Sequence, residues 1–241
     1  MFIMKPYGYT PHMALDISLV ESIPGWLTRR EANLLYNFAR RCTGKGVILE
    51  IGSWKGKSTV CLAQGSRDGA GVPVHAVDPF TGSSEHGQVF TFPEFQDNIQ
   101  RSGVSSLIVP HKKTSEGAAQ GWTKPIELLW IDGAHEEEFV RLDYTLWAPH
   151  LVQGGVIAFH DSTDPGVWPV IDAFLFMGNS FRRIRFIDGI TYAVKGKPIH
   201  GANTLMMRAR DIKYALWKMR DTWRKRQRGK GRTNDPKKNA C

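Results

Sequence analysis

The sequence has few cysteines and no long hydrophobic run. Its three cysteines, Cys42, Cys61 and Cys241, form no C-x-x-C pair among 241 residues, which excludes a disulfide framework and predicts a reducing compartment. We expect Cys42 and Cys61 to be buried packing residues. The apolar stretch in residues 1–6 is too short for a signal peptide, and no segment approaches the length that spans a bilayer. The sequence therefore predicts a cytoplasmic protein, either soluble or peripheral to a membrane.

The net positive charge of the sequence is not spread over the whole chain. The net charge is +9, but residues 205–241 hold thirteen Lys and Arg against three Asp, which is +10. The preceding 204 residues hold nineteen Lys and Arg against twenty Asp and Glu, which is −1. The basicity therefore belongs to a tail. With 41% hydrophobic residues, the remainder is long enough for one sizeable α/β domain with appendages.

Residues 47–59 have the pattern of a short buried strand, a glycine turn and the start of a helix. Gly52 and Gly56 have no Cβ, so backbone N–H groups and a helix N-terminus can approach a ligand there. Glu50 lies in this strand, and Asp78 closes the next apolar run. Two carboxylates at the ends of consecutive strands suit an amine and ribose hydroxyls better than a phosphate.

The turn lacks the spacing of the two commonest nucleotide motifs. Gly52 and the Gly-Lys-Ser at 56–58 enclose three residues, whereas a Walker A loop needs four. Residues 128–132 resemble a Walker B strand with its acid, so a P-loop-like nucleotide hydrolase remains an alternative. Trp54 occupies the middle glycine of the dinucleotide fingerprint, and no third glycine stands at the required offset, which disfavours NAD.

Short apolar strands alternate with amphipathic helices along the chain. Strands are predicted at 47–51, 74–77, 107–109, 126–131 and 156–159, and a hairpin at 181–187 and 190–194. Right-handed crossovers between consecutive strands imply a parallel sheet. We expect an N-terminal arm over 1–26, a catalytic domain over 27–197, and a basic helix and tail over 198–241.

Acidic residues end several predicted strands, and two of them lie beside histidines. Asp132 and Asp161 would meet at the carboxyl edge of a parallel sheet, where open α/β folds place their site. Their oxygens suit Mg²⁺, which helps a bound alcohol to lose its proton. His135 could accept that proton near neutral pH. The alternative is that both aspartates cap helices and His160 only packs at a strand end.

The whole pattern resembles the class I S-adenosylmethionine-dependent methyltransferases, whose first motif is an acid followed by spaced glycines and whose second is an acid closing the next strand. Trp54 followed by Ser58 is similar to the catechol-type and antibiotic O-methyltransferases. Asp-Gly-Ala-His at 132–135, Gly-Gly at 154–155 and His-Asp at 160–161 resemble the macrocin and mycinamicin sugar O-methyltransferases and the cephalosporin-hydroxylase-like group. This likeness covers roughly residues 27–194.

The resemblance implies a Rossmann-like three-layer sandwich whose sheet is mostly parallel and ends in an antiparallel hairpin. It implies S-adenosylmethionine as cofactor and methylation of a hydroxyl on a sugar or other small-molecule natural product. The implied cofactor-binding residues are Glu50, Gly52, Ser53, Trp54, Gly56, Ser58, Asp78, Ser115 and Asp132. Ser115 would lie against the adenine, although Thr114 or Ser115 could equally cap the helix that follows.

The resemblance also implies metal ligands at Asp132 and Asp161, a third ligand at the position of His160, and a general base at His135. The related proteins have an acid where this chain has His160. Histidine favours softer divalent metals than carboxylate does, so two questions stay open: whether a cation binds, and whether it is Mg²⁺ or another divalent ion. Trp168, Phe176 and the loop at 81–87 are predicted to shape the acceptor pocket. A non-catalytic module that retains the cofactor fold is the second alternative.

The tail contains apolar residues at helical spacing between basic ones, which predicts a basic amphipathic helix. The apolar positions are Ile212, Leu216, Met219 and Trp223. Such a helix could dock on the domain or lie on an anionic membrane surface. Nucleic acid is favoured least, since no base-stacking motif accompanies the charge. The sequence leaves the oligomeric state open.

Overall fold

The computed structural model describes residues 14–83, 87–198, 205, 207, 208 and 212. A seven-stranded sheet forms its centre, in the order β5-β2-β1-β6-β7-β9-β8. These strands are β1 (Val47–Ile51), β2 (Val74–Val77), β5 (Ile108–His111), β6 (Ile126–Ile131), β7 (Leu151–Phe159), β8 (Phe181–Ile187) and β9 (Ile190–Lys195). A separate two-stranded ribbon pairs β3 (Gly82–Ser83) with β4 (Gly87–Gln88).

Helices cover both faces of the sheet. They are α1 (Ile17–Ser22), α2 (Arg29–Arg40), α3 (Lys57–Arg67), α4 (Phe92–Arg101), α5 (Ser115–Ala119), α6 (Glu137–Trp147) and α7 (Trp168–Ile171), and a π-helical turn at Asp172–Phe176 continues α7. Short 3₁₀ turns occur at Ser105–Leu107 and Ala148–His150.

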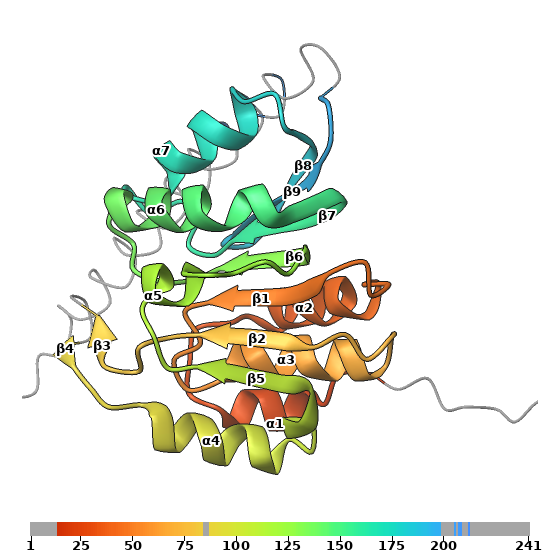
Figure 1. Cartoon of the computed structure of the whole chain (residues 1–241), viewed down its shortest axis with the longest axis vertical. Coiled ribbons are helices and arrows are strands. Elements are labelled where there is room, and N and C mark those ends of the chain that lie inside the picture. The colour runs from red at the N-terminus through yellow and green to blue at the C-terminus, as the bar shows by residue number, and fades with distance from the viewer. Residues whose placement is uncertain (1–13, 84–86, 199–204, 206, 209–211, 213–241) are drawn as a thin grey trace, which may run out of the picture.

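The predicted topology is confirmed in its main features. β1 pairs in parallel with β2 on one side and with β6 on the other, while β7 pairs with β9 and β9 with β8 in antiparallel fashion. The chain moves outward from β1 to β2 and β5, then returns to β6, so β1 and β6 flank a switch point where α/β folds bind ligands. Figure 1 shows β1, β2, β5 and β6 ending on the same side, next to the β3–β4 ribbon.

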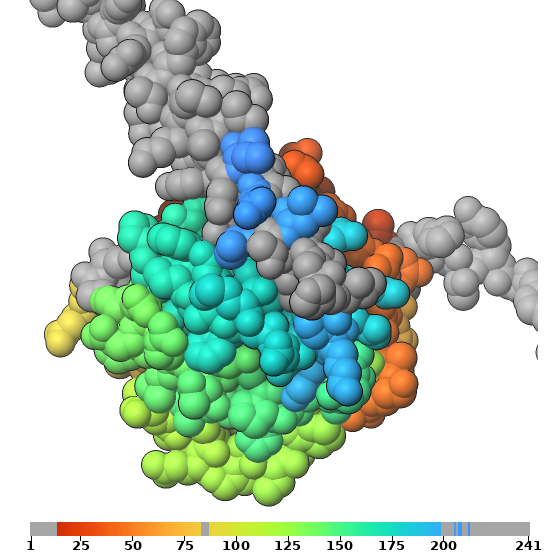
Figure 2. All heavy atoms as spheres, turned by 90° about the horizontal axis from the view of Figure 1, so that it is seen from above, coloured from red at the N-terminus to blue at the C-terminus, as the bar shows by residue number. Residues whose placement is uncertain are grey.

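The central strands are apolar because the sheet is buried on both faces. One hydrophobic core packs beneath α1 to α4 and includes Leu35, Val60 and Trp130. The other packs beneath α5 to α7 and includes Leu129 and Trp147. Figure 2 looks onto the end of the molecule at which the chain after residue 160, in cyan and blue, gathers.

The described part of the N-terminal arm, residues 14–26, contains a short helix and packs on the domain. Asp16 caps α1 by accepting from the Leu19 backbone N–H at 3.0 Å. Val20 and Ile23 are fully buried in the core of the domain. Residues 14–26 are therefore part of the folded unit, and residues 1–13 lie outside the described part.

Helix starts differ in how they are capped. Thr28 and Glu31 form a capping box at the start of α2, since each side chain accepts from the other's backbone N–H. Thr91 precedes α4 but makes no side-chain cap, and its hydroxyl is buried without a hydrogen-bond partner among the described residues. Cys42 and Cys61 are buried as predicted, and burial raises the pKa of the Cys42 thiol to about 12. None of the helices described in the structure is long and apolar enough to cross a membrane.

Candidate active site

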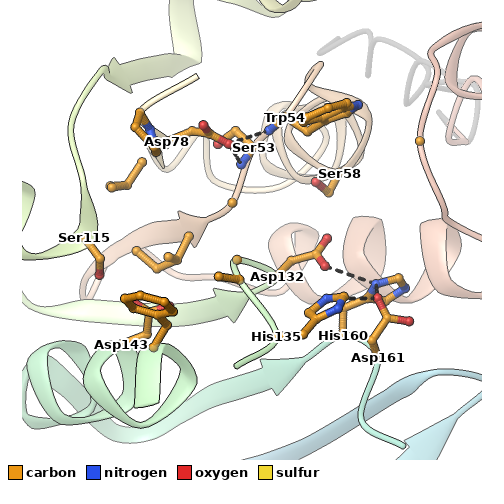
Figure 3. Close-up of a pocket in the computed structure, with 18 of the residues that line it drawn as sticks. Ser53, Trp54, Ser58, Asp78, Ser115, Asp132, His135, Asp143, His160 and Asp161 are labelled. Carbon is orange, nitrogen blue, oxygen red and sulfur yellow. Dashed lines mark hydrogen bonds and ion pairs between the residues drawn. The ribbon is translucent and has the colours of Figure 1, made fainter. Parts of the chain in front are cut away.

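A cavity of about 420 Å³ opens at the carboxyl ends of the central strands. Its walls come from the glycine turn after β1, the segments after β2 and β6, the start of α5, the inner side of α6, and the end of β7. Residues 24–27, just before α2, close a further side. Figure 3 shows the polar side chains pointing into this space from several elements.

The glycine turn approaches the neighbouring strand so closely that only glycine fits at its first position. Gly52 has φ of 86°, and a Cβ there would lie 2.0 Å from the carbonyl oxygen of Asp132. Trp54 also has a positive φ, of 48°, which costs energy for a side chain that is not glycine. Gly52, Ser53, Trp54 and Ser58 all line the cavity, as the sequence predicts.

Glu50 and Gly56 are the two predicted cofactor residues that do not line the cavity. The Glu50 carboxylate is fully buried and accepts hydrogen bonds from the hydroxyls of Ser53 at 2.9 Å and Thr59 at 2.5 Å. Gly56 caps α3, and a Cβ there would come within 3.1 Å of the Phe95 ring. Both residues shape the turn from beneath, because the chain after β1 folds over them.

Asp78 holds the turn from the side of β2. Its Oδ2 accepts from the backbone N–H groups of Ser53 at 2.9 Å and Trp54 at 2.7 Å, and its Oδ1 accepts from that of Phe80 at 2.5 Å. Burial raises the pKa of this carboxyl in spite of these hydrogen bonds. Asp78 also lines the cavity, so it offers acceptor oxygens to ligand hydroxyls.

The predicted acidic and histidine residues do meet at one wall. His160 Nδ1 lies 3.1 Å from Asp132 Oδ1 and 2.9 Å from Asp161 Oδ2, and His135 Nε2 lies 3.4 Å from Asp161 Oδ2. These side chains face one another from the ends of β6 and β7 (Figure 3). Asp161 has φ of 42°, a strained conformation of the kind that clusters at functional sites.

The charges of this group stabilise one another. Burial alone would lower the pKa of His160, but the charge of Asp132 and hydrogen bonds with Asp132, Asp161 and Glu31 raise it. The hydrogen bond and charge of His160 in turn lower the pKa of Asp161 against the effect of burial. For Asp132, burial is the stronger effect and its pKa is raised.

The donor atoms fit a divalent cation, although the set differs from the predicted one. One donor atom each from Asp132, His135 and Asp161 lies within 4.8 Å of the others. His160, predicted as the third ligand, turns Nδ1 towards both carboxylates, so it can share a cation with them through Nδ1 only when that nitrogen carries no proton. An imidazole among the donors favours a borderline metal over Mg²⁺.

Glu31 is a site residue that the sequence indicates only as part of a capping box. Its Oε2 lies 3.7 Å from His160 Nε2, and its side chain is 4% exposed. It also accepts from the backbone N–H groups of Thr28 at 2.8 Å and Gly189 at 2.7 Å. Glu31 therefore links α2 and the β8–β9 turn to the far side of the His160 ring.

Two predicted pocket residues lie elsewhere, and one missed residue lies inside. Phe176 is buried in the core beneath α7, and Trp168 is a surface residue that is 43% exposed; neither lines the cavity. Asp143 on α6 does line it and is 4% exposed. The signal was its position three residues after Val140 and four before Trp147, on the buried side of α6, where an aspartate is rarely placed for packing. Ser115 lines the cavity as well, while Thr114 makes the helix cap.

The chain is similar in sequence and in fold to known proteins. Residues 49–162 match a family model described as a methyltransferase domain. An O-methyltransferase from Bacillus cereus, solved in complex with SAH (S-adenosylhomocysteine), has 17% identity and a TM-score of 0.54, covering 75% of this chain and 88% of that chain.

Two further solved structures share the fold. The O-methyltransferase TomG from Streptomyces achromogenes, described as involved in tomaymycin synthesis and solved with SAM, has 18% identity and a TM-score of 0.54, covering 70% of this chain and 81% of that chain. The O-methyltransferase NovP has 16% identity and a TM-score of 0.60, covering 70% and 80%. Residues 49–162 are thus similar to a methyltransferase domain, and the chain shares its fold with these solved O-methyltransferases.

Proposed function

We propose that the protein is an S-adenosylmethionine-dependent O-methyltransferase that acts on a hydroxyl of a sugar or other small-molecule natural product. One observation supports this most directly: the glycine turn with Asp78 and the group of Asp132, His135 and Asp161 line the same cavity. A cofactor held at the turn would thus lie beside a candidate base. The O-methyltransferases among the similar structures support the same reaction type.

The cofactor half of the cavity suits S-adenosylmethionine better than a nucleoside triphosphate. Asp78 can accept hydrogen bonds from the ribose diol, as a carboxylate does in dinucleotide sites. The N–H groups of Ser53 and Trp54 already donate to Asp78, so a phosphate at this turn would meet a carboxylate. That arrangement disfavours the P-loop alternative.

We infer that His135 acts as the general base. Asp161 faces its Nε2 at 3.4 Å and would stabilise the imidazolium that forms when His135 takes the proton of the acceptor hydroxyl. The resulting alkoxide attacks the methyl carbon of the sulfonium, the C–S bond breaks, and S-adenosylhomocysteine leaves with the bonding electrons on sulfur. The proton ends on His135 and the methyl group on the acceptor oxygen.

Asp132 and Asp161 would hold a divalent cation, if one takes part, with an imidazole nitrogen as a further donor. When bound, such a cation lowers the pKa of a coordinated hydroxyl. His135 cannot serve as ligand and as base through the same nitrogen at once, so its proton-accepting role needs His160 or solvent to complete the cation's coordination.

The mouth of the cavity offers an apolar surface to the acceptor. Trp26, which is 64% exposed, and Trp54 lie with their ring centroids 6.1 Å apart and both line the cavity. Indole rings provide large apolar faces with a polar edge, which suits the mixed surface of a sugar. We place the acceptor on this side, instead of against Trp168 or Phe176.

Calorimetry with S-adenosylhomocysteine and with ATP tests the cofactor. We expect S-adenosylhomocysteine to bind and ATP not to bind; the reverse result would support a nucleotide hydrolase.

Transfer of a labelled methyl group to a panel of sugars and polyols, with and without Mg²⁺ or Mn²⁺, tests the reaction. Cofactor binding without transfer to any acceptor would support the non-catalytic module.

Metal content measured by mass spectrometry tests the cation independently of activity. We expect the wild type dialysed against Mn²⁺ to retain metal and Asp161→Ala to lose it. Equal metal content in both proteins would rule out Asp161 as a ligand.

A further inference from the structure

A buried carboxyl group, that of Asp143, lies at the end of the cavity away from the histidines. Asp143, in the second turn of α6, lines the cavity and is only 4% exposed. Figure 3 shows Asp143 and Ser115 together at one end of the cavity, with His135, His160 and Asp161 at the other. Asp143 is therefore too remote from the base to share its chemistry, and it needs another explanation.

A short hydrogen-bond chain orients Asp143. The indole Nε1–H of Trp147 donates to Ser115 Oγ at 2.8 Å. Because the serine oxygen already accepts, its own hydroxyl proton is free to donate to the Asp143 carboxyl, and this bond lowers the pKa of Asp143 against a larger effect of burial, which raises it to about 6. An ionised carboxylate can accept about four hydrogen bonds, and one hydroxyl leaves most of that capacity to a ligand.

Apolar side chains line the cavity together with Asp143. Phe139 and Leu142 come from the same helix, α6, and Val77 and Pro79 come from the segment around Asp78. Gly133 also lines the cavity, and a Cβ at Gly133 would come within 3.4 Å of Asp143 Oδ2, so the missing side chain leaves the carboxyl accessible. A flat ring that carries an N–H donor on its edge matches an apolar slot with a carboxylate at its end.

We propose that Asp143 is a specificity-determining residue that recognises the exocyclic amino group of the cofactor's purine base, with Ser115 and Trp147 as positioning residues. This inference rests on the proposed function, because that function supplies the adenine. The amino group would donate one N–H to the carboxylate. A 6-oxo purine would instead direct carbonyl lone pairs at it, leaving a buried acceptor facing an acceptor.

Calorimetry with S-adenosylhomocysteine and its deaminated 6-oxo analogue, S-inosylhomocysteine, tests the assignment. We expect the wild type to bind the adenosyl form roughly 10- to 100-fold more tightly, as for the loss of one hydrogen bond to a charged group. Asp143→Asn offers one acceptor and one donor, so it can pair with either base. Its preference should fall to within about threefold.

Glu116→Gln is the matched control, since Glu116 is an exposed carboxylate at the same end of the cavity. Its preference should equal that of the wild type. Wild type that binds both ligands equally, or Asp143→Asn that keeps the full preference, would overturn the assignment. Should Asp143→Asn fail to fold, as judged by thermal melting, the wild-type ratio alone still decides. Failure of the wild type to bind either ligand would instead refute the proposed cofactor.

Discussion

At the scale of single residues, Glu50 carries a charge that the fold disfavours. Its Oε1 is buried without a hydrogen-bond partner among the described residues, and burial raises its pKa to about 7 from 4.5. A carboxyl whose pKa rises on folding holds its proton more tightly in the native state. Its contribution to stability is therefore complete below about pH 4.5 and is lost as the pH rises through 7.

Glu50→Gln removes this ionisation while keeping the size and an acceptor oxygen. We expect the free energy of unfolding of the variant to rise relative to wild type by ~3 kcal/mol between about pH 5 and pH 8. Urea unfolding at several pH values measures the difference. A constant difference across that range would show that Glu50 is already ionised at pH 5.

His135 is the residue on which the proposed reaction depends. His135→Gln should lower kcat by roughly 10²–10⁴-fold, the usual contribution of general base catalysis, while the affinity for S-adenosylhomocysteine stays near the wild-type value. Steady-state kinetics and calorimetry check the two quantities. His150→Gln, outside the residues that line the cavity, serves as control. Full activity of His135→Gln from pH 6 to pH 9 would refute the base assignment.

At the scale of elements, the turn between β1 and α3 tolerates no side chain at its first glycine. Gly52→Ala would add a Cβ 2.0 Å from the carbonyl oxygen of Asp132 at a φ of 86°. The turn must move, so we expect ~2 kcal/mol or more of destabilisation and at least a tenfold loss of cofactor affinity. Thermal melting and calorimetry report the two effects.

Gly44→Ala is the matched control for this turn. Gly44 has nearly the same φ, 87°, with no atom within 4 Å of the added Cβ. Its replacement should cost only the backbone strain, ~1 kcal/mol, and leave cofactor affinity unchanged. Equal loss of affinity in both variants would mean that general destabilisation, and not the contact with Asp132, lowers the cofactor affinity.

The edge pair β2–β5 contains a second pH-sensitive element. His75 Nδ1 lies 2.8 Å from His111 Nε2, and the Trp122 ring packs edge-on against His75. Burial is the main reason that the pKa of His75 falls to about 4. The native state thus binds fewer protons than the unfolded chain below the ordinary pKa of 6.5, and stability is lost as the pH falls toward 4.

His75→Gln should remove the part of the stability loss at low pH that comes from protonation of His75. The stability advantage of the wild type over the variant should shrink by ~3 kcal/mol between about pH 7 and pH 4, as measured by urea unfolding. Other titrating groups contribute equally to the free energies of unfolding of both proteins, so their contributions cancel when the variant's value is subtracted from the wild-type value at each pH. An advantage that persists at pH 4 would show that the pair accepts a proton without cost.

At the scale of the whole molecule, the alternation of strands and helices could be predicted because each carries its own periodicity. The hydrophobic runs of β1 and β6 and the Asp188-Gly189 turn of the hairpin are local signals. Strand order came from the resemblance, since pairing partners are remote in sequence. The same limit applies to the site: strand-ending Asp132 and Asp161 could be predicted to converge, whereas the contact between Glu31 and His160 depends on how α2 packs on the sheet.

Acidic residues that tertiary packing buries were the hardest to interpret from the sequence. Glu50 has the position of a cofactor-binding acid in the sequence, but the turn folds over it. Asp143 reads as one polar residue on a helix until the cavity is known. Most of the tail, including Leu216, Met219 and Trp223, lies outside the described residues, so its predicted helix stays a prediction.

The tail sets the charge of the whole molecule, and this gives the last prediction. Residues 205–241 carry +10 against −1 for the rest of the chain. In the described part of the tail, Met207 packs against the core beneath α7, while Leu205 and Ile212 are 69% and 63% exposed. One apolar residue of the described part of the tail therefore packs on the domain, and two others expose their side chains.

We expect the full chain to sediment with anionic vesicles but not with neutral ones, because each basic residue near an anionic surface contributes about 1 kcal/mol. A chain truncated after Gly201 should sediment with neither. Binding should weaken as salt is raised, since the attraction is screened beyond a Debye length of about 10 Å at 0.1 M. If both chains bind anionic vesicles equally at low salt, the tail has no membrane role, and docking on the domain accounts for its apolar positions.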